Sequence, residues 1–519
     1  MRKVLLYICS VFILGGMTSC EDFLDKREDV GLTEDDIFRD YYSLRGFLDQ
    51  SFNQLENVMV MDNWENGRAF VGLFADEMAT TDNSSAVFTL HSGNWLSNAK
   101  SNKTFEIGNA GSTAISRSYK ALRINNRIIN DIDKAPLTPE QKNEILGQAY
   151  FYRSWFYFQI IKRYGGMPII DKVFEGGDDD IPRMTYHESH DWMMEDIQKA
   201  IYMLPDSWDD PNYGRPTKIA AMALKEWAQL FDASPLMQND LNSTENKGYD
   251  TERAKSAAKS AYEVIRYMDG SKSAPYPYGL ASKEEYTNVF YFKYPPVHQP
   301  EYIWVKRQFP NAANQNQKRT IRTFWQYEDL AFGSGPDGNS MCCPSLNIVN
   351  MFDKKGADGI YYPIDDPRSG YALDYDHKPF EDRDPRFYNN ILLPGTTWGH
   401  YADGRTYYIT TYKGGAAYQH MLTQKDCNKR MFTGFMCKKF MWPECNQYLE
   451  KNNPNCWWDY RFLTIYIRAS QIYLDYAEAL FEGCGSATAT IEGCPISAAE
   501  AINILRRRIG LTDLPSDFV

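Results

Sequence analysis

Few groups in this sequence are spaced for catalysis. His187 and His190 flank a glutamate, but zinc proteases that use such a motif place their histidines four positions apart, on one face of a helix. Here the spacing is three, and Glu188 is better placed to cap a helix together with Thr185. The sequence also has no Gly-x-Ser-x-Gly elbow and no phosphate-binding loop with its lysine. It therefore gives no positive indication of an enzyme.

Carboxylates do not single out a catalytic pair either. Glycosidases use two carboxyl groups, but no such pair can be distinguished among the 68 Asp and Glu residues. The acidic runs at 178–180 and 365–366 are typical of capped turns or solvated loops. A calcium ion could be held at such a loop, because calcium prefers several oxygen ligands. We therefore predict no cofactor, and calcium binding is left open.

Aromatic residues are the stronger indication of function. The chain contains 12 Trp, 36 Tyr and 28 Phe, which together make 15% of its 519 residues. The flat C–H faces of sugar rings pack on Trp and Tyr, while Asn, Asp and Arg bond the hydroxyl groups. Two stretches combine these types outside any helical pattern. The candidate ligand residues are Trp64, Arg68, Asp76 and Trp95 in the early stretch, and Tyr294, Trp325 and Tyr327, with Tyr291 nearby, in the middle of the chain.

Trp95 and Trp325 are the strongest of these candidates. Both lie in polar, turn-rich sequence, whose neighbours would not supply a hydrophobic core around them. The alternative for either residue is packing within a loop. Trp155, Trp192 and Trp227, in contrast, fall on helical stripes and are predicted to lie in the core.

Composition and charge restrict the class of partner. Hydrophobic residues at 43% and charged residues at 24% are close to globular averages, which excludes a disordered or fibrous chain. The 56 Lys and Arg residues against 68 Asp and Glu give a formal net charge of −12. Proteins that bind the phosphate backbone carry basic faces, so we predict no nucleic-acid partner.

The first twenty residues indicate export and lipidation. Arg2 and Lys3 precede an apolar run at 4–17 that is too short to span a bilayer as a mature helix. The run closes on Met-Thr-Ser-Cys, which resembles a bacterial lipobox whose cysteine is acylated. We predict a lipoprotein signal peptide over 1–19 and lipidation at Cys20. The alternative is an ordinary secretory signal with an accidental cysteine.

The remaining eight cysteines all lie late in the chain, after residue 341. None has the two-residue gap of a zinc knuckle or a redox pair. Disulfides within 427–456 and free buried thiols both fit this distribution, and the sequence does not give the connectivity.

Helix signals recur along the chain and come with caps. Thr138, Thr185 and Ser497 begin capping boxes, and Thr33 is a further candidate cap. Apolar residues at steps of three and four predict helices over about 37–55, 115–129, 145–160, 193–204, 219–230, 254–268, 472–480 and 498–509. Helix pairs with short connections are typical of a tetratricopeptide-type stack.

The middle of the chain has a different character. It is rich in Pro, Gly, Asn, Tyr and Trp, and only short runs such as 302–305 and 406–410 indicate strands. Loops of this length in a compact chain are usually functional. We therefore predict a mostly α fold, with a helical scaffold at about 33–270 and 462–510 and a loop-rich, weakly β ligand-face insertion at about 271–461.

An ordered set of motifs resembles the SusD/RagB family of outer-membrane nutrient-binding lipoproteins of Bacteroidetes. Each motif alone is weak, but together they cover nearly the whole chain. They are Phe-Leu-Asp after the lipobox cysteine, Gly-Gln-Ala-Tyr-Phe-Tyr-Arg-Ser-Trp-Phe-Tyr-Phe from 147, Arg-Tyr-Gly-Gly-Met-Pro from 163, Gly-Arg-Pro-Thr-Lys from 214, Asp-Pro-Arg-Phe from 384, Tyr-Leu-Asp-Tyr-Ala-Glu-Ala-Leu from 473 and Ala-Ile-Asn-Ile-Leu-Arg-Arg-Arg-Ile-Gly-Leu from 501.

The resemblance implies a single SusD-like domain over 20–519, built on four tetratricopeptide-like helix pairs with a loop-rich ligand face. It implies a lipid-anchored, surface-exposed protein that binds glycans and partners a SusC-like TonB-dependent transporter. An extracytoplasmic glycoside hydrolase and a peptide-binding variant of the same scaffold are the alternatives. The Glu-Arg…Glu-Gly-x-Arg-Trp pattern that commonly follows in the family is not found before Val519, so the sequence is expected to be truncated or atypical.

Overall fold

The structure is a computed structural model, and all statements below concern the residues that it describes. These are residues 33–55, 75–79, 114–174, 180–238, 247–273, 276–291, 299–307, 343–374, 378–400, 406–415, 433–439 and 463–519.

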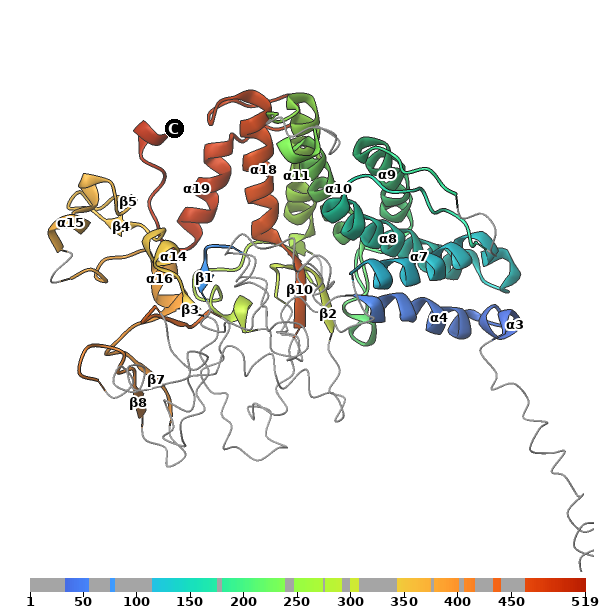
Figure 1. Ribbon diagram of the computed structural model, residues 1–519, viewed down its shortest axis with the longest axis horizontal. Coiled ribbons are helices and arrows are strands. Elements are labelled where there is room, and N and C mark those ends of the chain that lie inside the picture. The colour runs from blue at the N-terminus through green and yellow to red at the C-terminus, as the bar shows by residue number, and fades with distance from the viewer. Residues whose placement is uncertain are drawn as a thin grey trace, which may run out of the picture.

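The described helices form a curved stack (Figure 1), which confirms the predicted mostly α fold class. Each long helix packs against the next, so they follow one another along an arc from the first to the last. The long helices are α4 (Tyr41–Gln54), α7 (Ala114–Asp131), α8 (Pro139–Tyr164), α9 (Tyr186–Met203), α10 (Lys218–Ala233), α11 (Thr251–Gly270), α18 (Ala469–Cys484) and α19 (Ala498–Arg508).

Shorter helical segments connect and flank this stack. The short α-helices are α3 (Glu34–Ile37), α14 (Leu346–Asn350), α15 (Tyr371–Asp374) and α16 (Pro385–Asn390). Single turns of 3-10 helix are η2 (Ile132–Lys134), η3 (Asp210–Asn212), η4 (Pro235–Met237), η5 (Ser271–Ser273), η6 (Asn288–Phe290), η7 (Pro367–Ser369) and η9 (Ser516–Phe518).

Local capping chemistry sets where the scaffold helices begin. The Thr138 hydroxyl accepts a hydrogen bond from the backbone N–H of Gln141, whose side chain in turn accepts from the N–H of Thr138. The same reciprocal box joins Thr185 and Glu188 at the start of α9. These contacts satisfy backbone donors that the first helical turn leaves without partners. The boxes predicted at Thr138 and Thr185 are therefore confirmed, whereas at Ser497 only the hydroxyl takes part, accepting from the backbone N–H of Glu500 at 3.2 Å.

The prediction for the first helix was wrong in one respect. Thr33 does not cap the long helix but the separate short helix α3, and α4 begins only after Asp40. The side chain of Asp40 accepts a hydrogen bond from the backbone N–H of Ser43 at 2.8 Å. The apolar stripe continues through the interruption, because Ile37 and Phe38 are buried like Leu44, and periodicity alone therefore could not reveal the break.

The described strands form five antiparallel pairs. They are β1 (Met78–Ala79) with β3 (Cys343–Pro344), β2 (Tyr302–Arg307) with β10 (Leu463–Arg468), β4 (Lys354–Lys355) with β5 (Tyr361–Tyr362), β6 (Ile391–Leu392) with β9 (Met436–Cys437), and β7 (Thr397–His400) with β8 (Thr406–Tyr408). The predicted strand signals at 302–305 and 406–410 therefore correspond to β2 and, in part, to β8.

The pair β2–β10 packs its aromatic side chains against the middle of α8. Trp304 is 2% exposed, and its ring contacts Phe151 and Trp155 at centroid distances of 4.8 and 4.6 Å. Tyr466 from the partner strand lies 4.7 Å from the same indole. Aromatic pairs at these distances add to the free energy gained by burying their area. Trp155 is thus a core residue as predicted.

A buried ionic contact ties the end of the chain to this strand pair. Both carboxylate oxygens of Glu301 are used, one by Arg468 at 3.1 Å and the other by Arg508 at 2.8 Å. Burial alone would raise the pKa of Glu301, but the two guanidinium groups hold it below its ordinary value. Removing one partner would therefore leave a buried charge uncompensated.

A second buried group joins α10 to α18. Glu226 is fully buried, and the ionisable group that acts on it is Asp475 on α18, which accepts a hydrogen bond from the amide of Gln471 at 3.1 Å. Burial raises the pKa of Glu226 well above its ordinary value and that of Asp475 to about 7. The two carboxyl groups are therefore held in their protonated forms at acidic pH.

Among the described helices, none is both long and apolar enough to cross a membrane. The cysteines that the structure describes are free thiols: Cys343, Cys437, Cys484 and Cys494. The other cysteines of the late cluster, and Cys20, lie outside the described residues.

Candidate functional site

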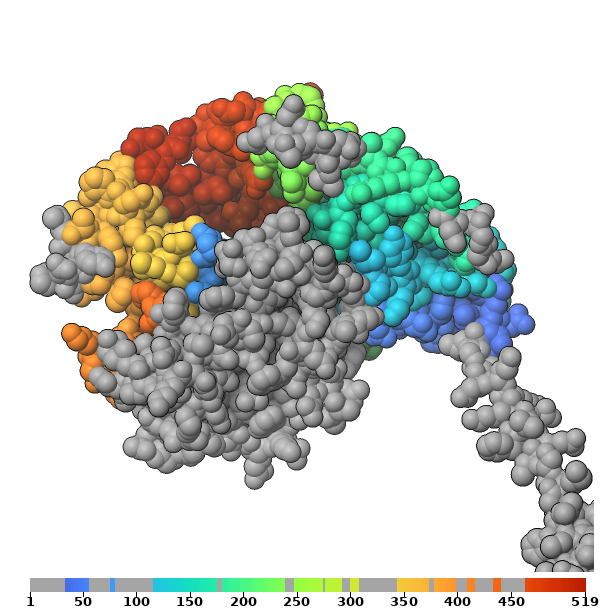
Figure 2. All heavy atoms as spheres, viewed as in Figure 1, coloured from blue at the N-terminus to red at the C-terminus, as the bar shows by residue number. Residues whose placement is uncertain are grey.

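A cleft of about 330 Å³ lies at one end of the helical arc. Three elements form its walls: the outer face of α4, the turn around η3, and the end of β2. We call it the polar cleft, and the residues that matter for its chemistry are Arg45, Asp49, Phe52, Asn212, Tyr213, Arg215 and Arg307. The blue α4 forms the end of the arc in the space-filling view (Figure 2).

The amide of Asn212 brings two arginines together in this cleft. Its side-chain oxygen accepts hydrogen bonds from the Nη2 group of Arg45 and from the Nε group of Arg215, the latter at 3.2 Å. The amide nitrogen of Asn212 donates to Asp209 at 2.6 Å, which fixes the orientation of the amide. The guanidinium groups of Arg45 and Arg215 therefore both donate to the same neutral oxygen atom.

Arg215 also forms an ion pair with Asp49, the acidic residue in the lining of the polar cleft. It donates to the carboxylate of Asp49, with the shortest contact at 2.7 Å, and to the amide oxygen of Gln148 on α8 at 3.0 Å. This arginine belongs to the Gly-Arg-Pro-Thr-Lys motif, which the structure places just before α10. The motif thus anchors the η3 turn to both α4 and α8.

The end of β2 supplies further positive charge. The Nη1 group of Arg307 donates to the backbone carbonyls of Asp210 and Pro211 at 2.8 and 3.2 Å. Lys306 donates to the carbonyl of Leu55 at 2.8 Å, and its ammonium lies 5.4 Å from the centre of the Phe52 ring. Burial, assisted by the charge of Arg117, lowers the pKa of Lys306 to about 8.

A smaller aromatic pocket of about 50 Å³ adjoins the cleft and shares two of its residues, Tyr213 and Arg215. Its other aromatic walls come from Trp208, Tyr276, Tyr278, Tyr302 and Trp304. The indole N–H groups in this wall bond the backbone, that of Trp208 to Pro216 at 2.8 Å and that of Trp304 to Gly214 at 3.2 Å.

Gly214 permits this close packing. Its φ of 98° lies in the left-handed region, and a Cβ at this position would stand 3.1 Å from the carbonyl oxygen of Val305. The combination of rigid aromatic walls and guanidinium donors suits a polar, ring-shaped ligand.

Most of the residues predicted from sequence to bind ligand cannot be placed. Six of them lie outside the described residues, namely Trp64, Arg68, Trp95, Tyr294, Trp325 and Tyr327. Asp76 is described and exposed, and its carboxylate accepts a hydrogen bond from the Asn347 amide at 3.3 Å beside the start of α14. The nearby Tyr291 is buried, which raises its pKa to about 12, so it packs rather than presenting a surface.

The polar cleft lies where the scaffold leads into both aromatic stretches. Leu55, at the end of α4, is the last described residue before the segment 56–74, which contains Trp64 and Arg68. Arg307 is likewise the last described residue before 308–342, which contains Trp325 and Tyr327. Two stretches that are far apart in sequence therefore leave the scaffold at the walls of one cleft.

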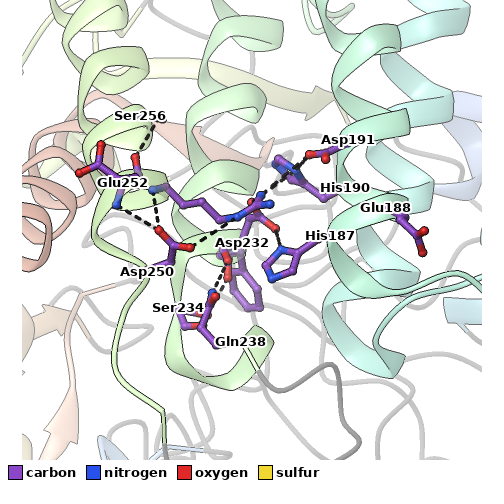
Figure 3. Close-up of polar contacts among 12 residues, drawn as sticks. His187, Glu188, His190, Asp191, Asp232, Ser234, Gln238, Asp250, Glu252 and Ser256 are labelled. Carbon is purple, nitrogen blue, oxygen red and sulfur yellow. Dashed lines mark hydrogen bonds and ion pairs between the residues drawn. The ribbon is translucent and has the colours of Figure 1, made fainter.

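The two histidines that resembled a zinc motif have a structural role. Figure 3 shows His187 and His190 turned toward the carboxylate of Asp232 on α10. The Nδ1 atom of His187 lies 2.6 Å from one oxygen of Asp232, and that of His190 lies 3.5 Å from the other and 3.0 Å from the neighbouring Asp191. Arg253 on α11 pairs with the Asp232 carboxylate as well. This cluster ties α9, α10 and α11 together, while Glu188 is used in the cap of α9.

No group of three or more potential ligands for a metal ion occurs among the residues that the structure describes. Of the acidic runs considered for calcium, Asp366 caps the turn η7 by accepting from the backbone N–H of Arg368 at 2.8 Å. Its carboxylate also pairs with the guanidinium of that arginine. Turn capping is therefore confirmed for Asp366.

Two family models match the chain. Residues 22–226 match a model described as starch-binding and associating with the outer membrane, and residues 300–518 match the model of the SusD family. A search of curated protein sequences gave no match.

Solved structures with the same fold include two from Bacteroides fragilis. One is a SusD-like protein with 21% identity and a TM-score of 0.65, covering 93% of this chain and 82% of that chain. The other is a SusD-like carbohydrate-binding protein with 18% identity and a TM-score of 0.62, covering 92% and 80%. A laminarin-binding SusD-like protein has 17% identity and a TM-score of 0.53, covering 92% and 86%.

Proposed function

Because the chain belongs to the SusD/RagB family, we propose that it captures glycan at the cell surface and passes it to a TonB-dependent transporter in the outer membrane. The observation that carries the proposal is the polar cleft, where hydrogen-bonding and aromatic side chains converge beside the exits to both aromatic stretches. Sugars need this combination, since their hydroxyl groups require donors and their ring faces require aromatic surfaces.

The descriptions of similar proteins support a glycan as the ligand. One family model is described as starch-binding, and the fold is shared with proteins described as carbohydrate-binding and laminarin-binding. These ligands differ from one another, so the scaffold is compatible with several glycans. We therefore propose the ligand class and leave the individual sugar to experiment.

The decisive test is a titration of the protein with a panel of oligosaccharides by calorimetry. We expect a dissociation constant between about micromolar and millimolar, which corresponds to roughly −8 to −4 kcal/mol. Trp95→Ala and Trp325→Ala should each weaken binding by about 2 kcal/mol if stacking on these residues supplies much of the free energy. A matched control is Tyr202→Ala, because Tyr202 is 86% exposed on α9 and lies on none of the surfaces proposed to bind ligand. Folded tryptophan variants that bind like the parent would contradict the assignment of these residues.

Capture without cleavage is part of the proposal. Incubation of the same glycans with the protein should leave their chain lengths unchanged in chromatography. Release of shorter sugars would instead support the alternative of a glycoside hydrolase, whose two carboxyl groups the sequence did not reveal.

The proposed localisation at the outer membrane depends on Cys20. Its acylation would anchor the protein, and Cys20→Ala should therefore lose incorporated acyl label and move from the membrane fraction to the soluble fraction. Retention of both in the variant would contradict lipid anchoring. Co-purification of a TonB-dependent transporter with the tagged wild-type protein from its native host would test the proposed partner separately.

A further inference from the structure

The charge of the polar cleft is opposite to that of the whole chain. The protein carries a formal net charge of −12, yet three arginines and one aspartate line this hollow. Asp49 already forms an ion pair with Arg215 at 2.7 Å. Arg45 therefore adds a positive charge to the lining of the cleft, on a protein whose net charge would otherwise repel anions.

Arg45 is the clearest source of that excess. Its partners among the described residues are neutral, namely the amide oxygen of Asn212 and the ring of Tyr41 at 5.9 Å. Asn212 also binds Arg215, so two like charges are held close together by one amide. Arg215 is already paired with Asp49, whereas the charge of Arg45 has no carboxylate partner among the described residues and would be stabilised by a bound anion.

The shape of the cleft suits a sugar that carries the anion. Its volume of about 330 Å³ lies at the lower end of the range for small-molecule sites. Phe52 and Tyr213 offer apolar walls against which a ring face can pack. The ammonium of Lys306 lies 5.4 Å from the centre of the Phe52 ring and adds positive potential behind this wall.

We propose that the polar cleft binds the anionic substituent of an acidic sugar residue, with Arg45 as its donor. The substituent is a uronic-acid carboxylate or a sulfate ester, because planar guanidinium groups bind either with paired hydrogen bonds. This inference rests on the proposed function, since it specifies the class of glycan that the protein captures.

The test compares polysaccharides that differ in charge but share a backbone. Polygalacturonate is paired with its methyl-esterified form, and dextran sulfate with dextran. Wild-type protein should bind at least one acidic member at least tenfold more tightly than its neutral partner, and added salt should weaken that binding. Preference within the first pair assigns a carboxylate, and preference within the second assigns a sulfate.

Variants locate the effect in the cleft. Arg45→Gln keeps a polar side chain beside Asn212 but removes the charge, and it should weaken binding of the acidic polymer about tenfold or more. Arg45→Lys should retain part of the affinity, because charge remains while the planar fork is lost. Arg266→Gln is the control, since this exposed arginine lies on α11 outside the cleft, and it should bind like the parent.

The outcomes separate this inference from the proposed function. Binding of neutral glycans without preference for the acidic members would overturn the acidic-sugar assignment and leave glycan capture intact. An acidic preference that Arg45→Gln leaves unchanged, with a normal melting temperature, would overturn the location. If the protein bound no glycan in these pairs or in the oligosaccharide panel, both proposals would fail.

Discussion

The buried carboxyl groups at the contact of α10 and α18 should make the scaffold less stable as the pH rises. Glu226 is fully buried, and the charge of Asp475 acts on it. Burial raises the pKa of Asp475 to about 7, and the charge of Glu478 acts in the same direction, whereas the hydrogen bond from Gln471 opposes it. Both carboxyl groups must lose protons at alkaline pH in a site that does not solvate the charges.

The magnitude follows from the shift of Asp475 alone. Its pKa in the unfolded chain is about 3.8, so between about pH 4 and 7 the folded protein keeps a proton that the unfolded chain has lost. The folded state then binds more protons, and the free energy of unfolding falls by up to about 1.4 kcal/mol per pH unit. Over this window the loss reaches at most about 4 kcal/mol, and the slope from this group vanishes above about pH 7.

The assay is thermal unfolding followed by circular dichroism between about pH 5 and 8. Asp475→Asn should flatten the dependence on pH, and it should be more stable than the parent near pH 8 because no charge is buried there. Glu226→Gln should act in the same direction. The control is Glu263→Gln, which changes an exposed carboxylate on α11 and should leave the slope unchanged. Equal slopes for the parent and Asp475→Asn would refute the reasoning.

Three further substitutions test the packing and the buried ionic contacts of the scaffold. Ala223→Leu should overpack the fully buried face of α10 and lower the free energy of unfolding by about 1–3 kcal/mol, as measured with denaturant. The glycan affinity of the folded fraction should not change. An unaltered denaturation midpoint would show that the site can expand. Asp232→Ala should cost about 3 kcal/mol, because it leaves two histidines and Arg253 without their shared carboxylate, and a melting temperature equal to that of the parent would contradict this role. Glu301→Gln should destabilise the attachment of α19 by a similar amount, seen as faster amide exchange around Arg508, and unchanged exchange would argue against the anchor.

Sequence patterns predicted the parts of the fold that depend on neighbouring residues. The capping boxes at Thr138 and Thr185 involve residues only three positions apart, so their chemistry is visible in the sequence and was confirmed. Helical periodicity likewise placed Trp155 in the core. The break between α3 and α4 was missed, because Ile37 and Leu44 continue the same buried stripe through it.

The polar cleft could not be predicted in this way. Arg45 and Asn212 are 167 positions apart in the sequence, and Arg215 and Asp49 are 166 apart. Only the packing of α4 against the scaffold brings them together. Arg215 was noticed as part of a family motif, but nothing in that motif indicated that it would face a hollow. The aromatic candidates Trp95 and Trp325 remain predictions from local composition.

The pairing of β2 with β10 has a consequence for how such proteins can diversify. Because this ladder holds Arg307 beside Leu463, the segment 308–462 begins and ends at one strand pair, whose Trp304 and Tyr466 pack on Trp155 of α8. The entropic cost of closing a flexible loop grows only with the logarithm of its length, by about 0.6 kcal/mol per doubling. Insertions and deletions that leave the strand pairs and the buried cluster of Val349, Phe352 and Phe387 within this range intact are therefore inexpensive, as long as the ladder and Trp304 are kept. Evolution can exchange one such segment for another, and a chimera that receives the corresponding segment of a relative should inherit the sugar contacts of that segment, while a preference set by Arg45 stays with the scaffold.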